Sequence, residues 1–258
     1  MLELNKIYNE DCLEGMKKIN DKSIDMILCD LPYGTTACKW DAIIPFDLLW
    51  REYKRILKNN GIIALTSSQP FTSALIMSNP KMYRHEWIWS KNKGSNFLNT
   101  KREPMKQHES ILIFSDGKWT YNPQKIERID KKRTKYMYKD NKQREFVGDI
   151  KQRTSFVDDK KMRCPKSVLD IKVERGLHPT QKPVALFEYL IKTYTNEGEL
   201  VLDNCIGSGT TAIACINTNR NYIGFENDEK YFNIAKNRII KHKQVIRDRV
   251  FNDVFNIK

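Results

Sequence analysis

Short apolar runs that end at an acidic residue constrain the fold of this chain more than any other feature. Residues 24–29 form one such run before Asp30, and residues 200–202 form another before Asp203. Runs of this length and composition predict strands that are buried on both faces. Further strands are predicted at 62–66, 85–89, 110–114 and 222–225, and helices at 46–57, 69–77, 183–194, 210–218 and 228–242. Because helices separate most of these strands, we predict an α/β fold with a mostly parallel sheet and helices on both faces.

The helix predicted at 46–57 has a clear expected end. Its last turn is followed by Lys58-Asn59-Asn60-Gly61, which is a basic residue, two polar residues and a glycine. A glycine just past the last periodic residue is a common stop signal for a helix. The sequence therefore predicts a turn at Gly61 that separates this helix from the strand at 62–66.

The chain is strongly basic, and the charge is concentrated in one segment. The formal net charge of the 258 residues is +13, and residues 118–166 hold sixteen Lys or Arg against seven Asp or Glu. This segment has little apolar periodicity, so we predict a basic insertion that interrupts a single α/β domain. The expected boundaries are 1–116 and 177–258 for the two parts of that domain and 117–176 for the insertion. Such a charge distribution favours a polyanionic partner.

The cysteines and the hydropathy pattern determine the expected compartment. The six cysteines include no CxxC pair and no zinc-like spacing, so reduced thiols are expected. No run approaches the ~20 apolar residues that a membrane-spanning helix needs. Residues 1–8 also lack the apolar segment of a signal peptide. We therefore expect a soluble, cytoplasmic protein.

A glycine-rich turn follows the strand that ends at Asp203. Gly207-Ser208-Gly209 leads into the helix predicted at 210–218, which is an arrangement that binds nucleotide-like cofactors. Glu226 ends the next strand, where an acid can hold both ribose hydroxyls. The loop lacks the Lys of a P-loop and the third glycine of the dinucleotide fingerprint. This favours an adenosine that carries an amino acid; the alternative is a tight turn without a ligand.

The tetrapeptide Asp30-Leu31-Pro32-Tyr33 has the composition of a site for the exocyclic amine of a nucleic-acid base. Such an amine is a weak nucleophile because its lone pair is delocalised into the ring. The Asp30 carboxylate and the Leu31 carbonyl can accept its two hydrogens, which localises the lone pair. Pro32 fixes the backbone, and Tyr33 offers a ring on which an extruded base can stack. The alternative is an ordinary break between a strand and a turn.

These two motifs, in this order and with a basic segment between them, resemble the amino-methyltransferase family that acts on DNA, in its β-type motif order. The resemblance covers about 4–114 and 178–239. It implies a Rossmann-like sheet of seven strands and S-adenosylmethionine as the cofactor. The family usually has proline at the position of Leu31, and proline and phenylalanine at the positions of Asn204-Cys205.

The resemblance also implies roles for individual residues. The segment His178-Pro179-Thr180-Gln181-Lys182-Pro183 is similar to one that closes over the methionine end of the cofactor, where Lys182 or a nearby hydroxyl would meet the carboxylate. Asp11 matches the acid that contacts adenine, although it equally suits the N-cap of a helix that starts at Cys12. The implied catalytic residues are Asp30, Leu31, Pro32 and Tyr33, without a metal ion. The implied cofactor-binding residues are Asp11, Cys12, His178, Thr180, Lys182, Asp203, Gly207, Ser208, Gly209, Thr210, Glu226 and Asn227.

The resemblance implies a site-specific methyltransferase that modifies the N6 amine of a flipped-out adenine in double-stranded DNA. Adenine is favoured because an Asp stands first in the catalytic motif. The alternatives are an N4-cytosine DNA methyltransferase, an RNA or small-amine methyltransferase, and a catalytically silent nucleic-acid-binding module. A homodimer and a cognate restriction endonuclease are both compatible with such an enzyme. Basic residues of the insertion are expected to contact DNA phosphates, namely Lys131, Lys132, Arg133, Lys135, Lys139, Lys142 and Arg144.

Overall fold

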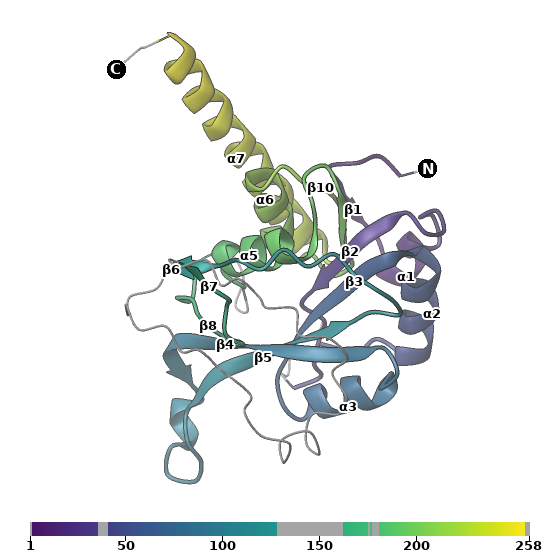
Figure 1. Ribbon diagram of the computed structural model, residues 1–258, viewed down its shortest axis with the longest axis vertical. Coiled ribbons are helices and arrows are strands. Elements are labelled where there is room, and N and C mark those ends of the chain that lie inside the picture. Colours follow the sequence, from purple (N-terminus) through teal and green to yellow (C-terminus); the bar gives the residue numbers. More distant parts are fainter. Residues whose placement is uncertain (1, 36–40, 128–161, 175, 177–180, 256–258) are drawn as a thin grey trace, which may run out of the picture. The chain divides into compact units, whose positions relative to one another are not determined.

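An eight-stranded sheet organises the larger part of the chain in this computed structural model (Figure 1). The structure describes residues 2–35, 41–127, 162–174, 176 and 181–255. The strand order is β1-β10-β9-β2-β3-β5-β4-β8, and the first five strands are mutually parallel. Strand β5 is antiparallel to both β3 and β4, and β4 pairs in parallel with β8. The strands are β1 (Lys6–Asn9), β2 (Ile24–Cys29), β3 (Leu57–Ser67), β4 (Tyr83–Ser95), β5 (Lys106–Phe114), β8 (Val168–Asp170), β9 (Leu200–Asp203) and β10 (Asn221–Glu226).

Helices cover both faces of this sheet. They are α1 (Cys12–Met16), α2 (Phe46–Ile56), α3 (Phe71–Ser78), α5 (Val184–Tyr194), α6 (Thr210–Asn217) and α7 (Glu229–Phe255). Successive residues of a strand point to opposite faces, and β2 shows this alternation clearly. Ile27 and Cys29 pack with α1, α2 and α3, whereas Met26 and Leu28 pack with α5 and α6. Because β2 is buried on both faces, it is continuously apolar, as predicted.

The predicted α/β fold with a mostly parallel Rossmann-like sheet is confirmed, but the sheet has eight strands where seven were expected. The two short edge strands, β1 and β8, produce no clear periodic pattern in the sequence. Strand β8 has only three residues, and it forms because Val168 pairs with Ile88 of β4. Such an edge strand depends on a partner that is distant in the sequence, so local composition does not predict it.

The predicted turn at Gly61 is wrong. Helix α2 ends at Ile56, and β3 begins at the next residue, because Leu57 is already extended and pairs with Ile24. The pairing register shifts before Ile62, so the polar residues between these positions form an irregular part of the strand rather than a turn. Lys58 of this part donates a hydrogen bond of 2.7 Å to the buried Asp25.

Two other segments differ from the expected pattern. Helix α7 continues to Phe255, well past the predicted end at 242, and a hydrogen bond of 2.7 Å from Gln244 to Asp248 supports its later turns. A second compact unit, Pro123–Pro165, contains the antiparallel strands β6 (Ile126–Glu127) and β7 (Met162–Arg163). Most of the basic insertion lies outside the described residues, so its predicted boundaries stay a prediction.

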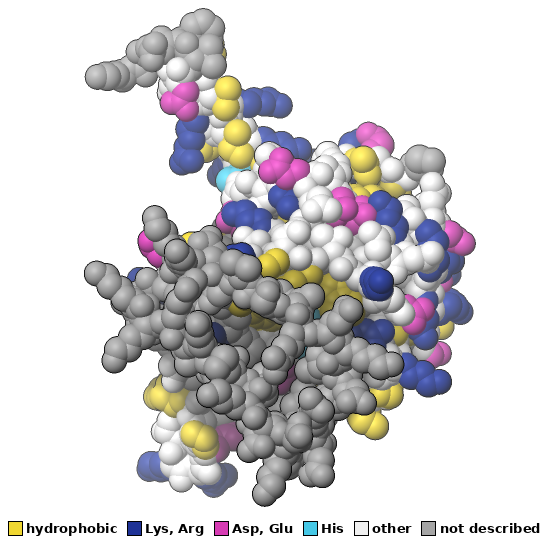
Figure 2. Space-filling model, viewed as in Figure 1, with side chains coloured by type: hydrophobic (Ala, Val, Ile, Leu, Met, Phe, Trp, Pro, Cys, Tyr) yellow, Lys and Arg dark blue, Asp and Glu magenta, His cyan; other side chains and the backbone are white. Residues whose placement is uncertain are grey.

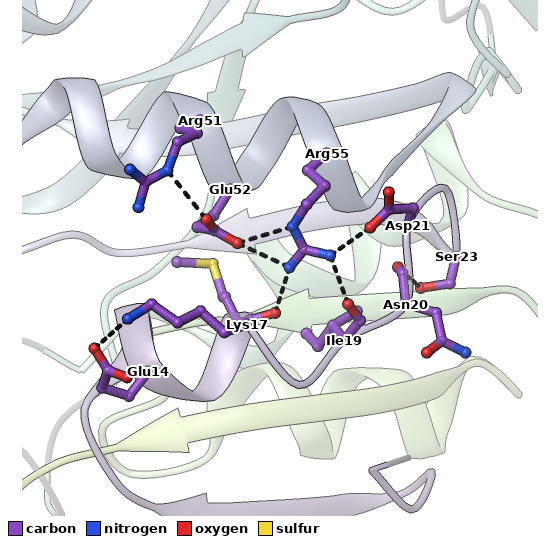
Figure 3. A network of polar contacts seen from close by, with 10 residues as sticks. Glu14, Lys17, Ile19, Asn20, Asp21, Ser23, Arg51, Glu52 and Arg55 are labelled. Atoms are coloured by element: carbon purple, nitrogen blue, oxygen red, sulfur yellow. Dashed lines mark hydrogen bonds and ion pairs between the residues drawn. The ribbon is translucent and has the colours of Figure 1, made fainter.

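A half-buried arginine, Arg55, joins α2 to the loop that follows α1 (Figure 3). The Arg55 guanidinium donates to the carbonyls of Met16 and Ile19, both at 2.8 Å. It also forms ion pairs with Asp21 at 2.6 Å and with the buried Glu52 at 2.8 Å. A single side chain therefore provides donors for two backbone carbonyls and for one buried carboxylate.

We expect Arg55→Ala to destabilise the protein by about 2–4 kcal/mol, because it leaves two carbonyls without donors and the buried Glu52 with only the exposed Arg51 as a partner. Urea unfolding followed by tryptophan fluorescence measures this loss. Arg51→Ala is the matched control, since Arg51 is 61% exposed and contacts the same Glu52 at 3.3 Å. The control should cost no more than about 0.5 kcal/mol. Equal losses in the two variants would contradict the role of Arg55.

Candidate active site

Four carboxylates lie at or just beyond the ends of four neighbouring parallel strands, at one edge of the sheet. Strand β10 ends at Glu226, β9 ends at Asp203, and Asp30 follows β2 directly. Asp11 follows β1, whose last residue, Asn9, pairs with Glu226. In an open parallel sheet, ligands bind beyond the carboxyl ends of the strands. The acidic residues predicted from separate motifs therefore surround the position where a ligand is expected.

A cavity of about 630 Å³ lies at this edge and brings the two motifs together. Gly209 does not line it, and His178 and Thr180 lie outside the described residues, as do all seven residues predicted to contact DNA. The predicted site residues that line the cavity are Asp11, Cys12, Asp30, Leu31, Pro32, Tyr33, Lys182, Asp203, Gly207, Ser208, Thr210, Glu226 and Asn227. Residues separated by more than 200 positions in the sequence thus line one cavity.

The glycines of the loop have distinct structural roles. Gly207 has a φ of +53°, and its amide donates to Glu226 at 2.9 Å. Gly209 has a φ of +84° and forms the N-cap of α6, where a Cβ atom would lie 3.2 Å from the Ala235 Cβ. Both conformations favour glycine. Gly207 shapes the cavity wall, whereas Gly209 allows α6 to pack closely against α7.

Asp203 is buried at the end of β9, with 3% of its surface exposed. Its carboxylate accepts hydrogen bonds from the Cys205 amide at 3.1 Å and from the Thr211 hydroxyl. Burial raises the pKa of Asp203 to about 7, although these hydrogen bonds oppose the shift. A cationic ligand in the cavity would favour the ionised form, so this carboxylate suits a positively charged partner.

Asp30 is held by three side chains. One carboxylate oxygen accepts hydrogen bonds from the Tyr33 hydroxyl at 2.8 Å and from the Thr66 hydroxyl. The other accepts a hydrogen bond of 2.5 Å from Lys182. The Tyr33 ring stacks on Phe71 with a centroid distance of 5.1 Å. The segment Asp30–Tyr33 is therefore held by contacts with side chains from other parts of the chain.

Lys182 contacts Asp30, which the sequence did not predict. The side chain is 6% exposed, and its amine lies 3.4 Å from Glu109 as well as 2.5 Å from Asp30. Burial alone would lower the pKa of Lys182, but the two carboxylates raise it above the ordinary value, so the amine is protonated. The expectation that Lys182 meets the cofactor carboxylate stays a prediction, and in this structure its partners are Asp30 and Glu109.

Glu109 is a site residue that sequence reasoning missed. It lies on β5 opposite Trp89 of β4, and one carboxylate oxygen pairs with Lys91. The other oxygen is buried without a hydrogen bond and faces Lys182. A lone acid in an alternating strand gives no local signal, because its importance comes from a lysine 73 positions further along the chain.

The departures from the family pattern at Asn204 and Cys205 have structural partners. Asn204 is buried and accepts a hydrogen bond of 2.5 Å from the Tyr53 hydroxyl. Burial raises the pKa of the nearby Cys29 to about 12, so this thiol is neutral. The five described cysteines are free.

Asp11 is the N-cap of α1, accepting from the Leu13 amide at 2.8 Å, so its predicted capping role is confirmed.

The described part of the chain lacks two features that would point to other functions. No group of three or more His, Cys, Asp or Glu side chains in the described residues could hold a metal ion. Among the same residues, none of the helices has the length and apolar character required to span a membrane.

A glycine-rich cofactor loop and a tetrapeptide suited to a base amine, placed in one cavity of a Rossmann-like sheet, define a nucleotide-cofactor-dependent transferase. The chain belongs to the DNA methylase family, whose model matches residues 24–237. The predicted family, and with it the predicted class of enzyme, is confirmed.

Individual relatives and solved structures agree with this membership. The type II methyltransferase M.HpaI of Haemophilus parainfluenzae is 30% identical over 91% of this chain and 74% of its own length. The DNA adenine methyltransferase YhdJ of Escherichia coli is 28% identical over 92% of this chain and 83% of its own length. The crystal structure of M1.HpyAVI in complex with S-adenosylmethionine has a TM-score of 0.61 and 27% identity, covering 90% of this chain and 98% of that one.

We expect Asp203→Asn to remove a pH dependence from the stability of the protein. Since the pKa of Asp203 is about 7 when folded and 3.8 as a free group, the folded state holds the extra proton between these values. The wild type should therefore lose stability as pH rises from about 4 to about 7, by up to ~1.4 kcal/mol per pH unit from this group. In urea unfolding at pH 5, 6, 7 and 8, the free energy of unfolding of the variant relative to the wild type should increase up to pH 7 and then stay constant. A constant difference between the two proteins would contradict the raised pKa.

Proposed function

We propose that this protein transfers the methyl group of S-adenosylmethionine to the N6 amine of an adenine in DNA. The observation that carries the proposal is the placement of Asp30 and the glycine-rich loop in one cavity of about 630 Å³. A volume of this size accommodates a nucleoside-sized cofactor together with an inserted base. The printed name of YhdJ, a DNA adenine methyltransferase, supports adenine as the base.

The cofactor would occupy the part of the cavity between the ends of β9 and β10. Glu226, at the end of β10, is placed for the ribose hydroxyls, and Asp11 lies at the adjacent strand end for the adenine amine. S-adenosylmethionine carries a sulfonium and an ammonium group. The buried Asp203 carboxylate would stabilise these charges, and the amides at the start of α6 suit the carboxylate of the same ligand.

The base amine would enter at Asp30. The Asp30 carboxylate and the Leu31 carbonyl accept the two amine hydrogens, and the nitrogen lone pair then points at the methyl group. The carbon–nitrogen bond forms as the carbon–sulfur bond breaks, in a direct displacement that requires alignment more than chemical activation. The nitrogen gains positive charge during transfer, and Asp30 is placed to stabilise it and to receive the released proton. Tyr33, fixed on Phe71, offers its other face to the base.

Lys182 would act as a positioning residue for Asp30. It fixes one carboxylate oxygen at 2.5 Å, while Thr66 and Tyr33 fix the other, so the carboxylate cannot rotate freely. Glu109 in turn holds Lys182. This network holds the Asp30 carboxylate in one orientation, which is a requirement for an acceptor of amine hydrogens.

Sequence-specific DNA contact would come from the basic insertion, which holds Lys131, Lys132, Arg133, Lys135, Lys139, Lys142 and Arg144. Type II methyltransferases such as M.HpaI and M1.MboII of Moraxella bovis are named for restriction-modification systems. We extend the proposal to a protective role beside a cognate endonuclease. A homodimer remains a prediction of the sequence.

Product analysis tests the proposed reaction. Incubation of the protein with labelled S-adenosylmethionine and unmodified DNA, followed by mass analysis of the nucleosides, should give N6-methyladenine. Asp30→Asn should lower the rate by roughly 10²–10⁴-fold, because a hydrogen-bond acceptor is replaced by a partial donor, while binding of the cofactor is retained. Asp116→Asn, at an exposed turn, is the matched control and should keep full activity. N4-methylcytosine as the product would overturn the assignment of the base, and full activity of Asp30→Asn would overturn its role.

Lys182→Met separates two roles for this lysine. If Lys182 positions Asp30, the turnover number should fall about 10–100-fold, with little change in the dissociation constant of S-adenosylmethionine. Lys17→Met, on the exposed face of α1, is the control. A large loss of cofactor affinity with an unchanged turnover number would instead support a contact between Lys182 and the cofactor carboxylate.

A further inference from the structure

The hairpin between β4 and β5 exposes two large apolar side chains at its tip. Phe97 and Leu98 lie in a single 3₁₀ turn, Phe97–Asn99, and are 68% and 83% exposed. Met105, on the returning side of the hairpin, is 45% exposed. Single exposed apolar residues are common on protein surfaces. Here two of them, Phe97 and Leu98, are adjacent at the end of a projecting hairpin, and together they form an apolar tip. Figure 2 shows hydrophobic and basic side chains together on this hairpin, at the lower left.

Polar contacts hold this tip in one conformation. Asn96 has a φ of +67° and donates to Glu103 across the loop. Asn99 donates to the same carboxylate at 3.1 Å and to Asn96 at 3.0 Å, and Thr100 donates to the carbonyl of Phe97 at 2.9 Å. The polar side chains of the turn thus bond to one another and leave the apolar pair exposed. A preformed tip loses little conformational entropy when it binds.

The same hairpin forms one wall of the active-site cavity. Trp89 and Glu109, which face each other across β4 and β5, both line the cavity. Gly94 and Ser95 line it as well, at the end of β4. Phe97 follows Ser95 by two residues, which corresponds to roughly 7 Å of extended chain. Because Ser95 lines the cavity and is itself exposed, the apolar tip begins at the rim of the cavity that would receive the base.

The charge around the tip favours a polyanion over an apolar protein surface. Residues 91–107 contain five Lys or Arg and one acidic residue. Lys93 is exposed before the tip, and Lys101, Arg102 and Lys106 are exposed after it. These residues can contact phosphates on both sides of an inserted apolar side chain, and apolar wedges with flanking cations are a known means of unstacking DNA bases.

We propose that the Phe97–Leu98 tip inserts into the DNA duplex and fills the gap that the target base leaves when it enters the cavity. This inference rests on the proposed function, since it requires a base that is extruded from a duplex. An extruded base leaves a gap next to its own sugar, so the group that fills it must lie at the mouth of the base pocket. The exposed pair satisfies this condition, and the basic residues beside it bind the two flanking phosphates.

The double variant Phe97→Ala/Leu98→Ala tests the wedge. The substrates are two duplex oligonucleotides that carry the methylated sequence mapped from the product DNA, one with the target adenine paired and one with it opposite an abasic site. The variant should lose about 10–100-fold in kcat/KM on the paired substrate and stay within about threefold of the wild type on the abasic one. An unpaired base needs no wedge to leave the stack. Phe97→Leu should recover much of the activity on the paired substrate.

Controls separate this proposal from its alternatives. Met77→Ala/Ile240→Ala removes two other exposed apolar side chains and should leave both rates unchanged. Equal rates of variant and wild type on the paired substrate would overturn the wedge, as would equal losses on both substrates, which indicate a role in DNA affinity alone. A change in oligomeric state by sedimentation would assign the tip to a second copy of the chain. Absence of DNA methylation by the wild type would overturn the proposed function. The results that overturn the wedge are rates of the variant measured against an active wild type, so the two failures are distinguishable.

Discussion

The parallel alignment of β1, β10, β9 and β2 is the constraint on which the rest of this structure depends. Parallel strands end at one edge, so each residue that follows a strand is placed beside the corresponding residue of the neighbouring strand. Pairing of Ile27 with Leu202 and of Asn9 with Glu226 fixes this alignment. Asp30 and Asp203 are therefore neighbours although the basic insertion and four other strands of the same sheet separate them in the sequence. The site is a consequence of strand register, and the loops only complete it.

The buried charges at this edge are balanced in two different ways. Asp30 and Glu109 share the buried cation of Lys182, so this half of the cavity is compensated within the protein. No cation among the described residues forms an ion pair with Asp203, and burial raises its pKa to about 7. The part of the cavity next to Asp203 therefore has a carboxylate that can pair with a positively charged ligand. In the part next to Asp30, the carboxylates are already paired with Lys182. This difference matches a sulfonium donor on one side and a neutral amine on the other.

The sequence predicted those parts of the site that depend on local pattern. Asp30 and Asp203 were identified because each follows a continuous apolar run, and Gly207 and Gly209 because a strand-to-helix turn requires positive φ angles. The contact between Lys182 and Asp30 spans 152 positions and depends on the packing of α5 beside β2, which no local pattern encodes. Glu109, the short strand β8 and the direct passage from α2 into β3 were missed for the same reason. Each of them is determined by a partner that is distant in the sequence.

Lys182 also connects the two halves of the cavity physically. Its carbonyl accepts a hydrogen bond of 3.3 Å from Thr210, in the first turn of α6, and its amine donates to Asp30. The start of α6 is the wall against which the cofactor would lie, so a shift of that wall displaces the backbone that carries Lys182. The amine contact would then pass this shift on to the Asp30 carboxylate. In the proposed reaction, one backbone segment would therefore contribute to the alignment of both the methyl donor and the amine acceptor.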